Sequence, residues 1–281
     1  MAKLIQYSTL ASQYNGAFDS NVGWAAAGMG YLIVTDNGRL IMIDGGFDED
    51  AEPIISLMRD YSGQKIPTVD LWIITHPHGD HYFALRRLAK DDIRNMLCIK
   101  TLSYYFPDGF SDRGGNTCLA DAREIQRVSD AFGADIIIPE IDGHIEIDGL
   151  DIHFLYVPKD TSELNNFNQI SLIFKVTGNG KSLLITGDAF HRNLQTVVDN
   201  YGDGLRSDIL QMPHHGLCDT GHIEFYRLAD AKTVLIPTSI AGYRAMHSDM
   251  YSIESRQANL FAEEKAESVF KSCDGTVELD I

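Results

Sequence analysis

Short runs of alternating hydrophobic and polar residues cover most of the chain, and turns rich in glycine separate them. Residues 31–34 and 39–43 flank Asp36-Asn37-Gly38, where Asn-Gly suits the positive φ of a tight turn, so we predict a hairpin there. Two more hairpins are predicted at residues 145–154 and 171–186. Runs typical of buried strands lie at residues 69–74, 135–138, 208–212, 233–236 and 276–281.

Helical patterns fall between these strands, at residues 54–61, 82–88, 118–132 and 252–268. Two β-rich halves separated by helices indicate an α+β protein in which two sheets pack together under outer helices. With 281 residues and 44% hydrophobic content, the chain can form one large core. We therefore expect a single domain over residues 1–281.

The sequence Thr-His-Pro-His-Gly-Asp-His at residues 75–81 is the most informative motif. It places His76, His78, Asp80 and His81 directly after the predicted strand at residues 69–74. In an extended chain His76 and His78 point the same way, whereas Asp80 and His81 turn into the following helix. One short loop can therefore supply donors to two metal ions.

Imidazole and carboxylate donors suit zinc, iron or manganese. Two ions about 3.5–4 Å apart can share a hydroxide, lower the pKa of that water to about 7 and stabilise the attacking and leaving oxygens. The motif therefore favours metal-dependent hydrolysis over redox chemistry or storage. The alternative is a chance cluster of surface residues.

Two later strand ends supply further donors. Asp188 follows the apolar run at residues 182–186 and is the candidate bridging ligand; Gly187 before it allows close approach. His214 and His215 follow the run at residues 208–212, and one of the pair is expected to be the last ligand. Taken singly, such residues are more often turn or surface residues, but their recurrence at strand ends favours a shared site.

These residues resemble the metallo-β-lactamase superfamily of metal-dependent hydrolases, which has a four-layer αββα sandwich fold. The resemblance also includes Ile43-Asp44-Gly45-Gly46 and Thr186-Gly187-Asp188. Within the superfamily, residues 168–174, the His-His-Gly element and residues 243–247 look most like the branch containing DNA-uptake nuclease domains and phosphorylcholine esterases. That branch mostly cleaves phosphoesters.

The resemblance implies a ligand set. His76 and His78 would bind one metal, Asp80 and His81 the other, Asp188 would bridge, and His214 or His215 would complete the second site. Asp44 would orient a ligating histidine from outside the ligand shell, unless it is only a turn residue before two glycines.

The chain departs from the family at one point. Many members have a third histidine for the first metal between the opening motif and the bridging aspartate. Here that region is rich in asparagine, and His144 and His153 fall in a predicted hairpin. We therefore expect the first site to be open or weak.

Two loops are candidates for contact with substrate. Residues 104–116 combine loop chemistry with aromatic side chains, so they form either a lid or wall of the pocket or a plug over the sheet edge. Tyr243 and His247 follow the strand at residues 233–236. His247 is a candidate catalytic residue that holds a substrate oxygen or donates a proton, or else an idle loop histidine.

Net charge and cysteine content indicate the class of substrate and the cellular location that the sequence favours. A formal net charge of −17 repels polyanions, which disfavours nucleic acid and favours a small-molecule phosphoester substrate. The four cysteines lack a Cys-x-x-Cys pair, which suits reduced thiols. With no apparent signal peptide or membrane segment, we expect a cytoplasmic protein that does not bind membranes.

Three functions remain open at this stage. The first is a dinuclear hydrolase of a phosphodiester or related phosphoester, with two divalent ions, zinc or alternatively iron or manganese, and metal-bound hydroxide as nucleophile. In that reading Asp80 and Asp188 take part in catalysis. The second is an acyl ester, thioester or lactam hydrolase of the same fold. The third is a metal-binding sensor or scaffold without catalysis.

Overall fold

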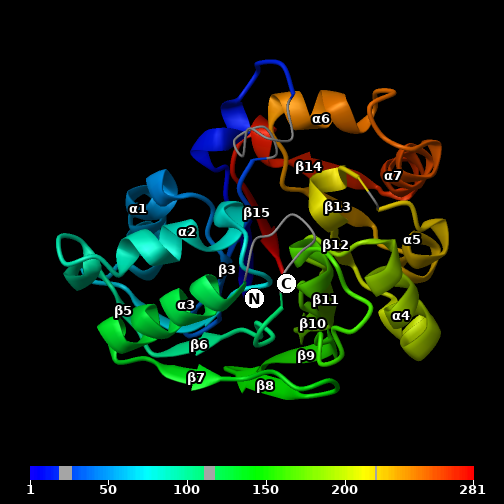
Figure 1. Ribbon diagram of the computed structural model, residues 1–281. Helices are drawn as coiled ribbons and strands as arrows, with labels where there is room; N and C mark the ends of the chain where they lie inside the picture. The colour runs from blue at the N-terminus through cyan, green and yellow to red at the C-terminus, as the bar shows by residue number, and fades with distance from the viewer. Residues whose placement is uncertain (19–26, 111–117, 219) are drawn as a thin grey trace.

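Two mixed β-sheets pack face to face, and helices cover the outer face of each (Figure 1). The computed structural model describes all residues except 19–26, 111–117 and 219. The expected four-layer αββα sandwich is confirmed by this arrangement of layers. None of the described helices is long and apolar enough to span a membrane.

The first sheet has the order β15-β1-β2-β3-β4-β6-β7, and β5 pairs with β4 off this path. Strands β3 and β4 run parallel, as do β4, β6 and β7. The bounds of these strands are β1 Lys3–Gln6, β2 Gly30–Val34, β3 Leu40–Asp44, β4 Thr68–Ile73, β5 Cys98–Ile99, β6 Thr101–Ser103, β7 Asp135–Ile137 and β15 Val277–Asp280.

The second sheet has the order β14-β13-β12-β11-β10-β9-β8. Strands β11 to β14 are parallel, whereas β8 to β11 form antiparallel hairpins. The bounds are β8 His144–Ile147, β9 Leu150–Tyr156, β10 Ile173–Gly178, β11 Lys181–Ile185, β12 Ile209–Gln211, β13 Thr233–Ile236 and β14 Ser268–Lys271.

Helices α1, α2 and α3 cover the first sheet, and α4, α5 and α7 cover the second (Figure 1). The helices are α1 Ala51–Ser62, α2 Gly79–Leu88, α3 Cys118–Phe132, α4 His191–Tyr201, α5 Ile223–Ala229, α6 Ile240–Met246 and α7 Ile253–Lys265. Short 3₁₀ turns include η5 Phe167–Ile170 and η7 Pro213–Gly216.

Side-chain alternation along β4 shows how the layers are held together. Leu71 and Ile73 enter the core between the two sheets, whereas Trp72 and Ile74 pack against the helices on the other side. Successive strand residues point to opposite faces, so a strand buried on both faces must be apolar throughout. This explains the continuous apolar run that precedes the metal motif.

The parallel strands bring the motifs together. Asp44 ends β3, and residues 75–81 follow β4 in the first sheet. In the second sheet Asp188 lies just beyond β11, and η7 follows β12. Because the carboxyl ends of parallel strands share one sheet edge, all four segments meet at one end of the sandwich.

The expected hairpins and the strands from 69–74 to 276–281 are present within a few residues. The sequence analysis did not predict strands β1, β5, β6 and β14 or helices α4, α5 and α6. Residues 266–268 were expected to end a helix, but α7 ends at Lys265 and β14 begins at Ser268. Parallel pairing of β14 with β13 supplies backbone hydrogen bonds there that local sequence does not reveal.

Candidate metal centre

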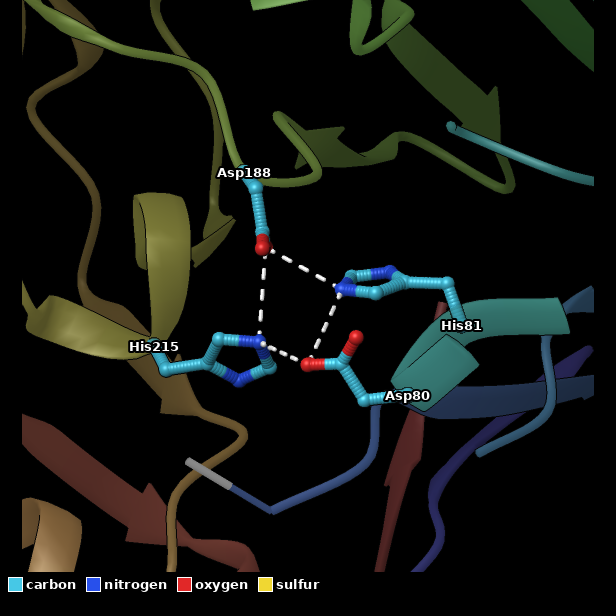
Figure 2. Close-up of side chains that lie close together, drawn as sticks. All are labelled: Asp80, His81, Asp188 and His215. Carbon is cyan, nitrogen blue, oxygen red and sulfur yellow. Dashed lines mark ion pairs between the residues drawn. The ribbon is translucent and has the colours of Figure 1, made fainter. Parts of the chain in front are cut away.

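Four donor side chains converge at the carboxyl edge of the sheets. Asp80, His81, Asp188 and His215 each offer one atom, and these atoms all lie within 4.8 Å of one another. We call these four residues the second cluster. Figure 2 shows the four side chains pointing toward a common centre from three separate segments.

Distances within the second cluster are short. His81 Nε2 lies 3.3 Å from Asp188 Oδ1 and 3.9 Å from Asp80 Oδ2. His215 Nε2 lies 3.3 Å from Asp80 Oδ2 and 3.4 Å from Asp188 Oδ1. Three of the four side chains are buried, and Asp80 is half-buried. The sequence left the choice between His214 and His215 open, and the structure places His215 in this cluster.

His76, His78 and Asp188 form a smaller group, which we call the first cluster. His76 Nε2 lies 3.6 Å from Asp188 Oδ2. His214 Nε2 lies 3.9 Å from the same oxygen, next to this cluster but outside the group of three. The two oxygens of Asp188 thus face different donor sets, which is the geometry expected of a bridging carboxylate.

Unpaired polar atoms test whether these residues fit metal ions. Among the described residues, His76 Nε2, His81 Nε2, His215 Nε2 and Asp188 Oδ1 are buried without a hydrogen-bond partner. Leaving such groups unpaired is costly, and buried polar atoms normally have partners. All four belong to the two clusters and point inward, so the donor set fits two divalent cations.

Contacts outside the clusters orient the rings of His76, His81 and His215. The carboxylate of Asp44 lies 2.7 Å from His81 Nδ1, and Thr75 Oγ1 donates to the same oxygen at 2.7 Å. Thr75 Oγ1 also lies 3.2 Å from His76 Nδ1. His215 Nδ1 donates to the backbone carbonyl of Pro237, in the loop that follows β13. Each Nε2 is therefore left free for a cation.

Asp44 thus takes the place expected of an outer carboxylate. It is fully buried and sits at the end of β3 with φ of 53°. Burial raises the pKa of Asp44, although His81 and Thr75 act in the opposite direction. The alternative interpretation as a turn residue before two glycines does not account for its contacts.

Burial favours neutral imidazoles in the first cluster in the absence of metal. Burial lowers the pKa of His76 well below its usual value and also lowers the pKa of His78 and of His214. These imidazoles are neutral at physiological pH. They can therefore accept a cation without first losing a proton.

The second cluster holds protons instead. Burial acts to lower the pKa of His81 and His215, but the surrounding carboxylates, Asp188 above all, outweigh it. The pKa of His81 is raised well above its usual value, and the pKa of His215 is raised to about 10. A cation entering this cluster must displace those protons.

Unusual backbone conformations occur where the ligands are presented. His214 has φ of 45° and His215 has φ of 56°, both in the left-handed region that non-glycine residues seldom adopt. Gly187 has φ of 53°, and a Cβ there would lie 2.9 Å from Thr75 Cβ. Such strain persists only where surrounding contacts enforce it, and it is typical of functional sites.

Aromatic residues border the first cluster. The ring of Phe167 lies 5.8 Å from the ring of His78, and Phe110 packs on Phe167 at 5.6 Å. On the other side, Phe190 lies 5.1 Å from the ring of His214. Phe110, the last described residue of the expected 104–116 loop, therefore contributes to the wall near the metal centre, whereas Tyr104 and Phe106 pack into the core beneath the helices of the first sheet. Residues 111–116 of this loop lie outside the described residues.

His247 pairs with a carboxylate of α7. Its Nε2 lies 3.1 Å from Glu263 Oε1 on α7, and the Tyr243 hydroxyl donates to the same carboxylate at 2.9 Å. Within the described chain His247 makes no contact with either cluster. These contacts give no support for a catalytic role of His247, so that role stays a prediction.

The missing third histidine is not replaced by the hairpin histidines. His144 and His153 stack on each other at 4.3 Å on β8 and β9, paired with Asp151 and Asp142. The sequence did not single out Asn168 as a site residue. Its Nδ2 lies 3.1 Å from His214 Nε2, and its Oδ1 is buried without a partner. The asparagine-rich composition of this segment is the sequence feature that could have indicated a role for Asn168.

Comparison with known proteins agrees with this geometry. Residues 26–155 match the family model of the metallo-beta-lactamase superfamily. A stretch of 69 residues is 35% identical to competence protein ComA of Neisseria gonorrhoeae, which amounts to 25% of this chain and 10% of that protein. The matched stretch therefore covers only about a tenth of the length of this relative.

Solved structures share the fold at low sequence identity. The metallo-beta-lactamase fold protein YhfI of Bacillus subtilis is 14% identical with a TM-score of 0.56, over 99% of this chain and 100% of that one. Zn²⁺-bound PqqB of Methylobacterium extorquens is 15% identical with a TM-score of 0.52, over 100% of both chains. CmlA of Streptomyces venezuelae, a diiron β-hydroxylase, is 10% identical with a TM-score of 0.55, over 99% of this chain and 54% of that one. Residues 26–155 are therefore similar to the metallo-β-lactamase superfamily, and the chain as a whole has the metallo-β-lactamase fold.

Proposed function

We propose that this protein is a dinuclear metal-dependent hydrolase of a small phosphodiester or related phosphoester. The observation that carries the proposal is the carboxylate of Asp188. Its Oδ2 faces His76, and its Oδ1 faces His81 and His215. A single buried side chain is thus positioned to serve two cations at once.

His76, His78 and Asp188 would hold one ion, and the second cluster would hold the other. When bound, such ions supply a water of lowered pKa and positive charge for the oxygens of the reacting group. Asp44 keeps the His81 ring oriented by accepting from its Nδ1 at 2.7 Å. Phe167, packed beside His78, limits the access of bulk water from that side.

Support for phosphoester substrates comes from sequence. The His-His-Gly element and residues 168–174 resemble the branch of the superfamily that mostly cleaves phosphoesters, and the similarity to competence protein ComA agrees with that branch. A formal net charge of −17 favours a small substrate over a long polyanion. An acyl substrate is the alternative for the same metal centre, and a metal-binding sensor is the alternative without catalysis.

A substrate panel tests the proposal. Protein loaded separately with Zn²⁺, Mn²⁺ or Fe²⁺ is assayed on bis(p-nitrophenyl) phosphate, p-nitrophenyl phosphorylcholine, a thioester and a chromogenic β-lactam. Iron is included because CmlA, with the same fold, is a diiron protein. We expect turnover of a phosphoester with at least one metal. Preference for the thioester or lactam would replace the proposal with the acyl alternative, and binding without turnover would favour the sensor.

Two variants show whether any activity belongs to the metal centre. His78→Ala should abolish turnover, because it removes a donor of the first cluster. His144→Ala is the matched control, since His144 is exposed on the β8–β9 hairpin and pairs only with its neighbours there. Equal loss in both variants would point to a contaminating activity or a general effect on the fold.

A further inference from the structure

Gln211 is a buried carboxamide between the two loops that present Asp188 and His215. It is the last residue of β12, and its side chain is fully buried. It belongs to neither cluster. Burying a polar side chain is unfavourable unless all of its groups are paired, so its contacts indicate what it does.

Every hydrogen-bonding group of this side chain is paired. Oε1 accepts from the backbone N of Thr186 at 2.8 Å and from Thr186 Oγ1 at 3.0 Å. Nε2 donates to the carbonyl of Gly187 at 3.0 Å and to that of Met212 at 2.6 Å. The amide thus links the end of β11 to the end of β12 beyond the last strand pairing, which joins Leu184 to Leu210.

The contact with Gly187 acts on the peptide group that leads into Asp188. The carbonyl of that peptide also accepts from His214 N at 3.1 Å, and its N–H, on Asp188, donates to Ser171 Oγ at 3.0 Å. Both edges of the peptide plane are therefore held. Because a peptide is planar, this fixes the direction in which Asp188 leaves the backbone.

The contact with Met212 acts on the other loop. Met212 immediately precedes η7, in which His214 and His215 take left-handed conformations. Strained backbone of this kind requires outside contacts to persist. Gln211 holds the start of this loop and the peptide before Asp188 with the two hydrogens of one NH₂ group, so the two loops cannot move apart independently.

We propose that Gln211 is a positioning residue that sets the separation of the Asp188 and His215 loops and thereby preforms the second cluster. The inference rests on the metal centre of the proposed function. Residues that orient metal ligands from outside the ligand shell typically change metal affinity by about 10- to 100-fold when they are replaced. Gln211 differs from such residues because it contacts the backbone of the two ligand loops and not the ligand side chains.

Gln211→Met tests the proposal, because methionine has a similar shape without the amide. Gln6→Met is the matched control. Gln6 is also buried, and its amide contacts Tyr31 and a backbone carbonyl of β14, remote from both ligand loops. Metal-free wild type and both variants are titrated with Co²⁺ in competition with a chelator, following the visible absorption bands and the thermal unfolding midpoint.

We expect both substitutions to lower the unfolding midpoint. Only Gln211→Met should weaken Co²⁺ binding at the second cluster, by about 10-fold or more, and alter the Co²⁺ bands. Equal affinity and identical bands in Gln211→Met and wild type would overturn the proposal. Equal weakening in Gln6→Met would also overturn it, since the effect would then be one of general stability.

Should Gln211→Met fail to fold, Ser171→Ala carries the test. It releases the opposite edge of the same peptide, so weaker Co²⁺ binding is required and unchanged binding contradicts the proposal. The wild-type titration separates this inference from the proposed function. If wild type binds no Co²⁺, the metal centre itself is refuted. If wild type binds Co²⁺ and the variants bind it equally well, only the positioning role is refuted.

Discussion

The second cluster and the first cluster use the same Asp188 carboxylate with different neighbours. The second adds Asp80, His81 and His215, is backed by the Asp44 carboxylate, and carries protons in the absence of metal. The first adds only His76 and His78, whose pKa values burial lowers.

The difference indicates that the two clusters bind their ions with different affinities. Four donors, two of them carboxylates, favour retention of a cation, whereas a site with three donors keeps a position open for water or substrate. We expect the second cluster to hold its ion more tightly and the first to exchange its ion more readily.

Asp188→Asn should disable both clusters, because it removes the charge that they share. We expect loss of both ions and a fall in turnover of at least about 100-fold, since each ion contributes several kcal/mol to the transition state. Elemental analysis and kcat measured on the same preparation check this. Retention of two ions per chain would show that Asp188 does not bridge.

Paired alanine variants should separate the clusters. His78→Ala should lose the weaker ion and keep the tighter one, whereas His215→Ala should lose the tighter one. The affinity difference lies in the range of about 10- to 100-fold, because an orienting carboxylate supports the second cluster directly. Chelator competition on each variant measures it. Loss of the same ion in both variants would contradict the assignment.

Asp44→Asn should weaken the second cluster by about 10- to 100-fold through the orientation of His81. A smaller effect on the first cluster is expected, because Asp44 reaches His76 only through Thr75. Metal titrations of the variant give the dissociation constants of both clusters. A larger loss of metal affinity at the first cluster than at the second would contradict the assignment of Asp44 to the second cluster.

The pH dependence of stability should come from the second cluster. In the metal-free protein the pKa of His215 is about 10, above its usual 6.5. A raised histidine pKa contributes stability that is fully present below pH 6.5 and is lost as the pH rises toward 10. The unfolding midpoint of metal-free wild type should therefore fall over this range.

His215→Gln is the control for that decline. It removes the titrating ring, so its midpoint should fall less between pH 6.5 and 10. His76 and His78 have lowered pKa values, so their contribution to stability does not decrease over this range and they do not account for the decline. An identical slope in wild type and His215→Gln would place the titrating group elsewhere.

Much of the fold and most of the candidate site could be predicted from sequence. Residues 69–81 combine a strand buried on both faces with donors placed at its end, and both features are local. The choice of His215 over His214 could not be predicted, because it depends on two successive left-handed residues. Those conformations are imposed by contacts from other segments.

Gln211 and Asn168 were missed for a related reason. Each is a polar residue in an apolar or mixed run, and neither has a spacing that indicates a role. Their significance comes from tertiary contacts, with Gly187 for Gln211 and with His214 for Asn168. The catalytic role expected of His247 stays a prediction, and the contact that the structure gives this residue is with Glu263.

Anomalous diffraction from crystals of the metal-loaded protein tests the central claim most directly. The account predicts two anomalous peaks, one on each side of the Asp188 carboxylate. One should contact His76 and His78, and the other should contact Asp80, His81 and His215. A single peak, or peaks that do not share Asp188, would contradict the dinuclear centre.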